Sequence, residues 1–234
     1  MKGFSMTGLF SAFDTLIVID TETTGVNAQR DEIIELGAVR FRRGGAEFVT
    51  DEELSCLIRL PTGRVLPPMI EQITGISQSM LDTEGIGRRE AAERLHGFMR
   101  GGRTLCVAYN AQFDLSFLYY FLARFGMADC LRGLKFLDAL TVYRDRRPYP
   151  HRLENAIEAY HLGEQAVNSH RAIDDAKATV CLLEAMAAEE NDLDRYVNLF
   201  GYHPKYGISG KPIGSVTYCA QSYDPHPPLY MLSE

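Results

Sequence analysis

The amino-acid sequence predicts an α/β domain with a mixed central sheet flanked by helices, and three observations support this fold class. Residues 15–20, TLIVID, form a short β-branched run between turn-forming residues, which is typical of a buried strand. Residues 32–41 predict a second strand, and the glycine pair at 44–45 indicates a hairpin to a third. Beyond this meander, strand-like and helix-like segments alternate, which favours a mixed sheet.

The remaining elements follow a proline-rich link at residues 60–68. A strand is expected at residues 104–108, and residues 135–140 are expected to be a short strand that runs into the start of a helix. Helical patterns lie at residues 69–73, 89–99, 111–125, 152–161 and 171–189. Residues 201–234 hold five of the ten prolines, so this stretch is not expected to be ordinary helix. The sequence therefore predicts a main domain over residues 1–190. Residues 191–234 form a C-terminal arm, irregular or with short strands, that could contact a partner or a second copy.

Composition excludes several classes of protein. With 234 residues, of which 46% are hydrophobic, the chain can bury a core, and no apolar run reaches the ~20 residues of a membrane span. Five widely spaced cysteines, with no CxxC pair, indicate a reducing cytoplasm. The formal net charge of −7 argues against non-specific coating of nucleic acid, because that affinity comes from many Lys and Arg contacts to phosphates.

The first pair of candidate site residues is Asp20 and Glu22, at the end of the first predicted strand. Side chains alternate along a strand, so a spacing of two aims both carboxylates at the same side. Two such carboxylates repel each other unless a cation lies between them. A solvated turn before TTG is the alternative interpretation of the pair.

A second candidate, Asp114, begins the apolar stripe of the helix predicted over residues 111–125. An acid on this inward face is unusual, and compensation of the helix dipole, the alternative explanation, does not require that face. Asn110, one turn earlier, is expected to be the helix N-cap or to orient the Asp114 carboxylate.

The third element, SHRAIDDAKAT, places Asp175 on the packing face of a helix and Asp174 about 100° away from it. His170 precedes this helix in a loop, where an imidazole can lie near a site. The alternative interpretation is an ordinary solvated histidine. Four inward acids at a strand end and two helix starts favour Mg²⁺ or Mn²⁺ over zinc, because no Cys or His cluster has metal-ligand spacing. Such a pair of ions suits in-line displacement at phosphorus.

Three spaced motifs of the sequence resemble those of a known enzyme family. The motifs that match, in order and approximate spacing, those of the DEDDh family of 3′→5′ exonucleases are Asp20-x-Glu22, Asn110-x-x-x-Asp114 and His170-x-x-x-x-Asp175. The surrounding segments are most similar to the proofreading epsilon (DnaQ-like) exonucleases of bacterial DNA polymerase III and their stand-alone relatives. The resemblance covers about residues 13–189, including ITGIS at 73–77, and departs at Tyr109, where relatives commonly have His. It implies a ribonuclease H-like fold.

The resemblance also implies the roles of individual residues. Two divalent cations, Mg²⁺ or Mn²⁺, would be held by Asp20, Glu22, Asp114 and Asp175. His170 would act as general base on the attacking water. The residues implied to contact the substrate are Thr21, Thr23, Ile76 and Asn110. Ordinary core packing is an equal alternative for Ile76.

The expected partner is the 3′ end of single-stranded or frayed DNA, from which nucleoside 5′-monophosphates are released in proofreading or repair. Residues 144–152, rich in arginine and including Tyr149, suit single-strand phosphates and base stacking, with a solvated loop as the alternative. RNA trimming or degradation of short oligoribonucleotides is the alternative activity. A DNA polymerase subunit is a candidate partner, and the sequence leaves the oligomeric state open. An inactive binding module is disfavoured because all four acids and the histidine are present.

Overall fold

The computed structural model describes residues 7–45, 47–166, 169–224 and 226–232, and its main feature is a five-stranded sheet in the order β3-β2-β1-β4-β5. The strands are β1 (Thr15–Thr23), β2 (Ile33–Gly44), β3 (Glu47–Leu57), β4 (Thr104–Ala108) and β5 (Lys135–Asp138). β2 is antiparallel to both β1 and β3, whereas β4 pairs with β1 in parallel and β5 with β4 in parallel. The predicted mixed α/β class is therefore confirmed.

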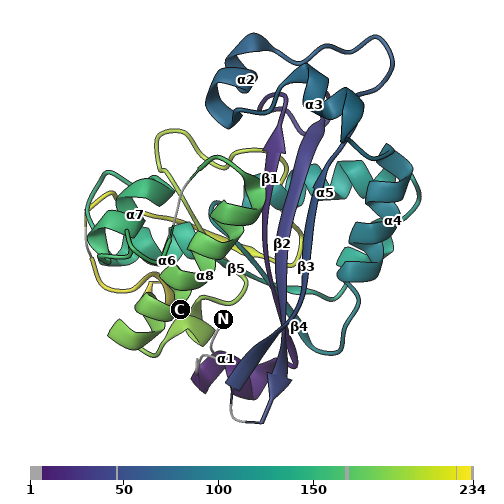
Figure 1. The fold of residues 1–234 in the computed structure, drawn as a ribbon. Coiled ribbons are helices and arrows are strands. Elements are labelled where there is room, and N and C mark those ends of the chain that lie inside the picture. The colour runs from purple at the N-terminus through teal and green to yellow at the C-terminus, as the bar shows by residue number, and fades with distance from the viewer. Residues whose placement is uncertain (1–6, 46, 167–168, 225, 233–234) are drawn as a thin grey trace.

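Helices cover both faces of this sheet, and a pair of short helices caps one end (Figure 1). One face is covered by α6 (Ala139–Arg146), α7 (Leu153–Ala159) and α8 (Ala172–Glu189). The other face is covered by α4 (Arg88–Phe98) and α5 (Ala111–Ala123). The capping helices are α2 (Pro68–Thr74) and α3 (Gln78–Thr83), and they lie at the end toward which β1 points. No element was expected before residue 15, but the described residues before β1 form α1 (Thr7–Ala12), whose Leu9 is buried in the core.

Alternating strand residues divide the core into two layers. Leu16 and Val18 of β1 face the α8 side, and Ile17 and Ile19 face the α5 side. This alternation follows from the period of two along a strand. Since β1 is buried on both faces, its sequence is a continuous apolar run rather than an alternating one. The apolar run of β1 thus ends at Asp20, at the same edge of the sheet as the ends of β4 and β5.

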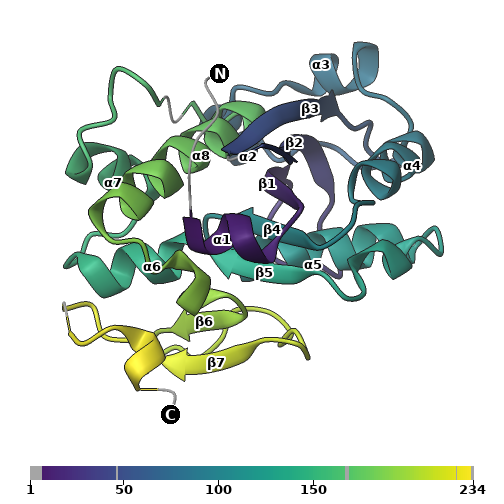
Figure 2. The ribbon, with the colours of Figure 1, turned by 90° about the horizontal axis from the view of Figure 1, so that it is seen from below.

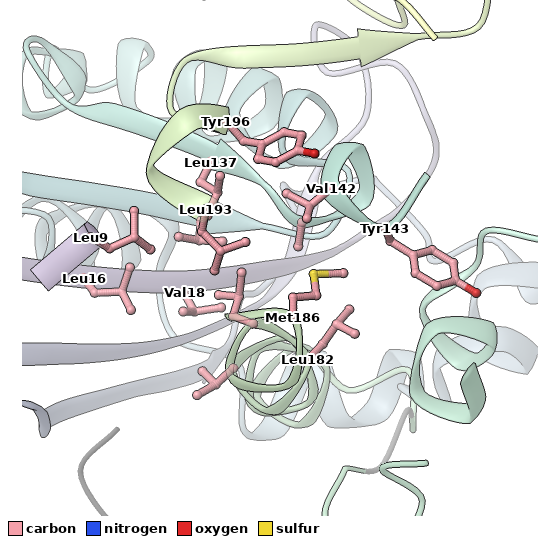
Figure 3. Packing of buried hydrophobic residues seen from close by; sticks show 14 of the residues in the cluster. Leu9, Leu16, Val18, Leu137, Val142, Tyr143, Leu182, Met186, Leu193 and Tyr196 are labelled. Atoms are coloured by element: carbon pink, nitrogen blue, oxygen red, sulfur yellow. The ribbon is translucent and has the colours of Figure 1, made fainter. Parts of the chain in front are cut away.

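The described residues of the C-terminal arm, 191–224 and 226–232, pack along β5 and α6 (Figure 2). Its elements are the 3₁₀ turns η2 (Leu193–Tyr196) and η3 (Leu229–Met231) and a small parallel pair, β6 (Leu199–Tyr202) and β7 (Thr217–Ala220). Asn198 exchanges two hydrogen bonds with Phe136 of β5, so the arm covers the free edge of the main sheet. Figure 3 shows Leu193 and Tyr196 in the same core cluster as Val18 of β1 and Met186 of α8. The arm therefore contributes side chains to the core of the domain.

Two general features complete the fold. All five cysteines are free thiols. Within the described ranges, every helix is too short or too polar to cross a membrane.

Candidate active site

Asp20 and Glu22 lie side by side at the carboxyl end of β1. The strand continues to Thr23, three residues beyond its predicted end, because its last residues still pair with β2. Glu22 is opposite Glu35, and Asp20 is opposite Gly37. The alternation of a strand therefore directs both carboxylates to the same face, as the sequence predicted.

Asp114 reaches this edge from the first turn of α5, where it is only 2% exposed. The Thr21 hydroxyl donates a hydrogen bond to its carboxylate over 2.7 Å. Asn110 occupies the predicted N-cap position, but with a left-handed backbone (φ 66°) and no capping bond from its side chain. The buried Asp138 carboxylate instead accepts the N–H groups of Asn110 and Ala111, at 2.9 and 3.1 Å. Asp138 thus fixes the helix start that carries Asp114.

The first turn of α8 brings the third group of residues. Glu22, His170 and Asp175 each offer one ligand atom, and these atoms lie within 4.8 Å of one another. Asp175 is buried and accepts the Ser169 N–H, whereas His170 is exposed in the loop before the helix, with a positive φ of 54°. Asp174 is half-buried, and its carboxylate accepts the Ser169 hydroxyl. Asp175 is therefore the inward acid, as predicted, and the histidine stands beside it.

Burial raises the pKa of all four site acids, and repulsion from the other site acids adds to the shift for Asp20 and Glu22. Burial raises the pKa of Asp20, and the charges of Asp114, Glu22 and Asp175 raise it further. Burial also raises the pKa of Glu22 to about 8, that of Asp114 to about 7 and that of Asp175 to about 6. Carboxylates held this close favour a bound cation, which would offset their repulsion. Their oxygen atoms are the donors that hard divalent ions prefer, so these residues fit such an ion.

The residues that position α8 are not among those predicted from the sequence. Glu35 on β2, 1% exposed, accepts three hydrogen bonds from the Arg171 guanidinium and one from the Ala172 N–H. Beside it, Gly37 lets the helix start touch the sheet, since a Cβ there would lie 2.1 Å from the backbone of Ala172. The signal was available in the sequence, because Glu35 interrupts a β-branched apolar run as Asp114 interrupts an apolar stripe.

The predicted substrate contacts are placed as follows. The Thr21 and Thr23 hydroxyls are buried and bonded to Asp114 and to the Gly25 carbonyl, while Asn110 is exposed at the site. Ile76 is fully buried in a cluster under α2 and α3. This position agrees with ordinary core packing, the alternative interpretation of that residue. The apolar side chains exposed in the same region are Val65, Met69 and Ile73. The roles of all four residues in binding substrate stay predictions.

The fold and the site agree with a comparison against known families. The family model described as exonuclease, RNase_T, matches residues 17–183, which include Asp20, Asp114 and Asp175. The chain belongs to this exonuclease family.

Individual relatives support the assignment. The DNA polymerase III subunit epsilon of Treponema pallidum is 33% identical over 184 residues, covering 76% of each chain. The PolC-type DNA polymerase III of Clostridium perfringens is 33% identical over 73% of this chain, but this exonuclease-family chain spans only 11% of that relative. The sequence is thus similar to epsilon-type exonucleases, as predicted.

A solved structure shares the fold of this exonuclease-family member. E. coli exonuclease I in complex with a dT13 oligonucleotide superposes with a TM-score of 0.68 at 21% identity, covering 78% of this chain and 43% of that one. The predicted ribonuclease H-like fold is therefore confirmed.

Proposed function

We propose that the chain is a metal-dependent 3′→5′ exonuclease of the DEDDh type that hydrolyses DNA from its 3′ end and releases nucleoside 5′-monophosphates. The observation that carries the proposal is the convergence of four acids with raised pKa values and one exposed histidine at a single edge of the sheet. Exonuclease I was solved with a single-stranded oligonucleotide, which supports a single-stranded DNA substrate here.

In this proposal Asp20, Glu22, Asp114 and Asp175 would hold two divalent ions, Mg²⁺ or Mn²⁺. When bound, the ions would stabilise the negative charge that develops on the attacking and leaving oxygens. His170 accepts the proton of the attacking water, and its position in an exposed loop gives that proton a route to solvent. The four carboxylates cannot also accept this proton while they serve as metal ligands, because a ligand carboxylate must stay ionised.

The names of the epsilon and PolC-type relatives favour a place in replication fidelity. We propose that the chain proofreads or repairs together with a polymerase subunit, in the cytoplasm. The alternative substrate, an RNA 3′ end, has the same scissile bond, so parallel digestion of labelled DNA and RNA single strands decides between them.

Digestion of a 5′-labelled single strand with Mg²⁺, Mn²⁺ or EDTA tests the proposal. A ladder of products shortened one nucleotide at a time from the 3′ end, and abolished by EDTA, is expected. Asp20→Ala, Asp175→Asn and His170→Ala should each lower the rate by about a hundredfold or more, since general-base catalysis alone contributes roughly 10² to 10⁴. Asp174→Asn is the matched control, and it should keep the rate within a few-fold because, among the described residues, the Asp174 carboxylate accepts a hydrogen bond from Ser169 and from no other side chain. Full activity of repurified Asp175→Asn would contradict the metal assignment.

A further inference from the structure

A cluster of aromatic rings lies outside the catalytic residues, where the loop between α6 and α7 meets the C-terminal arm. We define the aromatic patch as Tyr149, His151, His203, Tyr206 and Tyr223. The Tyr223 ring is central, with centroids 5.4 Å from Tyr149, 5.6 Å from His151 and 4.4 Å from His203. His203 in turn stacks on Tyr206 at 4.7 Å. The rings thus form one continuous surface.

The patch is exposed although aromatic rings usually contribute to a core. Tyr149 is 68% exposed, Tyr206 71% and Tyr223 38%. Large apolar groups left in water carry no folding benefit, and an exposed group of them is typical of an interaction surface. The surface is nevertheless held in shape, because the Tyr149 N–H donates to the Tyr223 carbonyl over 3.1 Å. These observations favour a binding surface that exists before its ligand arrives.

One hydrogen bond connects the patch to the segment that precedes Asn110 at the proposed active site. The Tyr109 hydroxyl donates to the His151 carbonyl over 2.8 Å, and Tyr109 stands directly before Asn110, at the start of α5. Because β4 runs parallel to β1, with Val107 opposite Val18, the end of β4 and Asp20 reach the same edge of the sheet. A chain held at the carboxylates can therefore continue past Asn110 onto the rings.

The charges around the patch suit an anionic ligand. Lys205 lies over the Tyr206 ring at 5.2 Å and Arg144 over the Tyr223 ring at 5.3 Å. Among the described residues, neither cation has a carboxylate within ion-pair distance, and the buried Arg144 Nε has no hydrogen-bond partner. Arg152 is exposed nearby and pairs only loosely, at 3.5 Å, with Glu154. Arg144 is itself buried, so Lys205 and Arg152 are the two cations beside the rings that a ligand can reach.

We propose that the aromatic patch binds the single-stranded DNA that leads away from the 3′ terminus held at the carboxylates. The bases stack on Tyr149, Tyr206 and Tyr223, and the phosphates lie against Lys205 and Arg152. Stacking on exposed rings beside cations is how proteins hold single strands without reading their sequence. The inference rests on the proposed exonuclease function, because that function places a 3′ end at the neighbouring edge.

Binding and cleavage are measured separately to test this. Fluorescence anisotropy with 5′-labelled dT12 in EDTA gives Kd without digestion. Tyr149→Ala and Tyr206→Ala should each raise Kd by about fivefold or more, and the double variant by roughly thirtyfold, as expected for the loss of one stacked base per ring. The corresponding Phe variants keep the rings and should stay within about twofold of the unchanged protein. Tyr119→Ala is the matched control, since Tyr119 is also exposed but lies on α5, outside the patch.

Three outcomes overturn the inference: an unchanged Kd in the double Ala variant, an equal loss in Tyr119→Ala, or stronger patch-dependent binding of rU12 than of dT12. The first of these would leave the patch as a surface for a protein partner.

Hydrolysis of thymidine 5′-monophosphate p-nitrophenyl ester, which is too short to reach the patch, should be unchanged in all variants. A protein that binds dT12 through the patch but hydrolyses neither substrate with Mg²⁺ or Mn²⁺ refutes the proposed function and supports the patch. A protein that digests dT12, and whose Kd for dT12 is unchanged by the ring substitutions, supports the proposed function and refutes the binding role of the patch.

Discussion

Replacing Glu35 by Gln should disturb the site although Glu35 is not one of its proposed ligands. Its carboxylate binds the Arg171 guanidinium at 2.7 to 3.2 Å and accepts the Ala172 N–H at 2.9 Å. The side chain of Gln has one acceptor oxygen and no charge, so it cannot serve both partners. α8 would then lose the group that fixes its first turn, which carries Asp175 and follows His170.

The magnitude follows from the burial of the two partners. Removing one partner of a buried ion pair costs about 3 to 5 kcal/mol, because the other charge is left without compensation. The Arg171 side chain is 38% exposed, so water can solvate the guanidinium, and about 2 to 3 kcal/mol is expected. For a chain of this size, that corresponds to a fall in Tm of about 4 to 12 °C. A shift of about 1 Å in catalytic groups can cost roughly a hundredfold in rate, so kcat/KM should fall by tenfold or more.

Glu53→Gln provides the matched control for this experiment. Glu53 on β3 also pairs with a basic residue of α8, Lys177, at 2.7 Å, but both side chains are more than one-third exposed. Exposed pairs contribute about 0 to 1 kcal/mol, so Tm and rate should change little. Thermal unfolding and digestion of a labelled strand are measured on both variants. Equal Tm values and equal rates for the two would refute the role of Glu35 in positioning α8.

Three further predictions follow from the same structure. Because burial raises the pKa of Asp114 to about 7 and of Glu22 to about 8, the metal-free folded protein holds more protons than the unfolded chain above pH ~4. Its Tm in EDTA should therefore fall between pH 5 and 8 and be restored by Mn²⁺ at pH 8; a Tm insensitive to both would contradict the electrostatic description. Gly37→Ala should lower both Tm and activity, because its Cβ would collide with the first turn of α8, whereas Gly97→Ala, with open space around it, should do neither. Deleting residues 191–234 should abolish the cooperative unfolding transition seen by circular dichroism, since the arm buries six large side chains worth ~1.5 to 3 kcal/mol each; a folded truncated protein would contradict this.

The sheet and its helices could be predicted because their sequence patterns are strong and local. The run TLIVID is short and β-branched, which favours a strand over a helix, and the stripe from Asp114 to Phe125 keeps a helical period over about three turns. The predicted helices over 111–125 and 171–189 match α5 and α8 within two residues. The arm could not be predicted at this level, since β6 and β7 have four residues each and depend on contacts with β5 and α6.

Acids that face inward could also be predicted, but not the residues that hold them in place. An inward carboxylate stands out because the pattern requires an apolar residue there. Glu35 gives the same signal, yet it interacts with Arg171, 136 positions away, and only the fold brings the two together. The Asp138 carboxylate likewise acts on the start of α5 from the next strand. Sequence spacing therefore locates candidate ligands, whereas their orientation depends on contacts between distant segments.

The net charge of −7 is unevenly distributed, and this explains how an acidic chain could act on an acidic polymer. Four of the negative charges are the site carboxylates, whose burial already raises their pKa values and which divalent ions would neutralise. With 24 Lys and Arg against 31 Asp and Glu, the chain lacks the excess of cations that tight binding through many phosphate contacts needs. Ring stacking needs no such excess of positive charge, because every base has an aromatic face. A short hold on a few nucleotides, based on rings and a few cations, is therefore the mode of binding that this charge distribution favours.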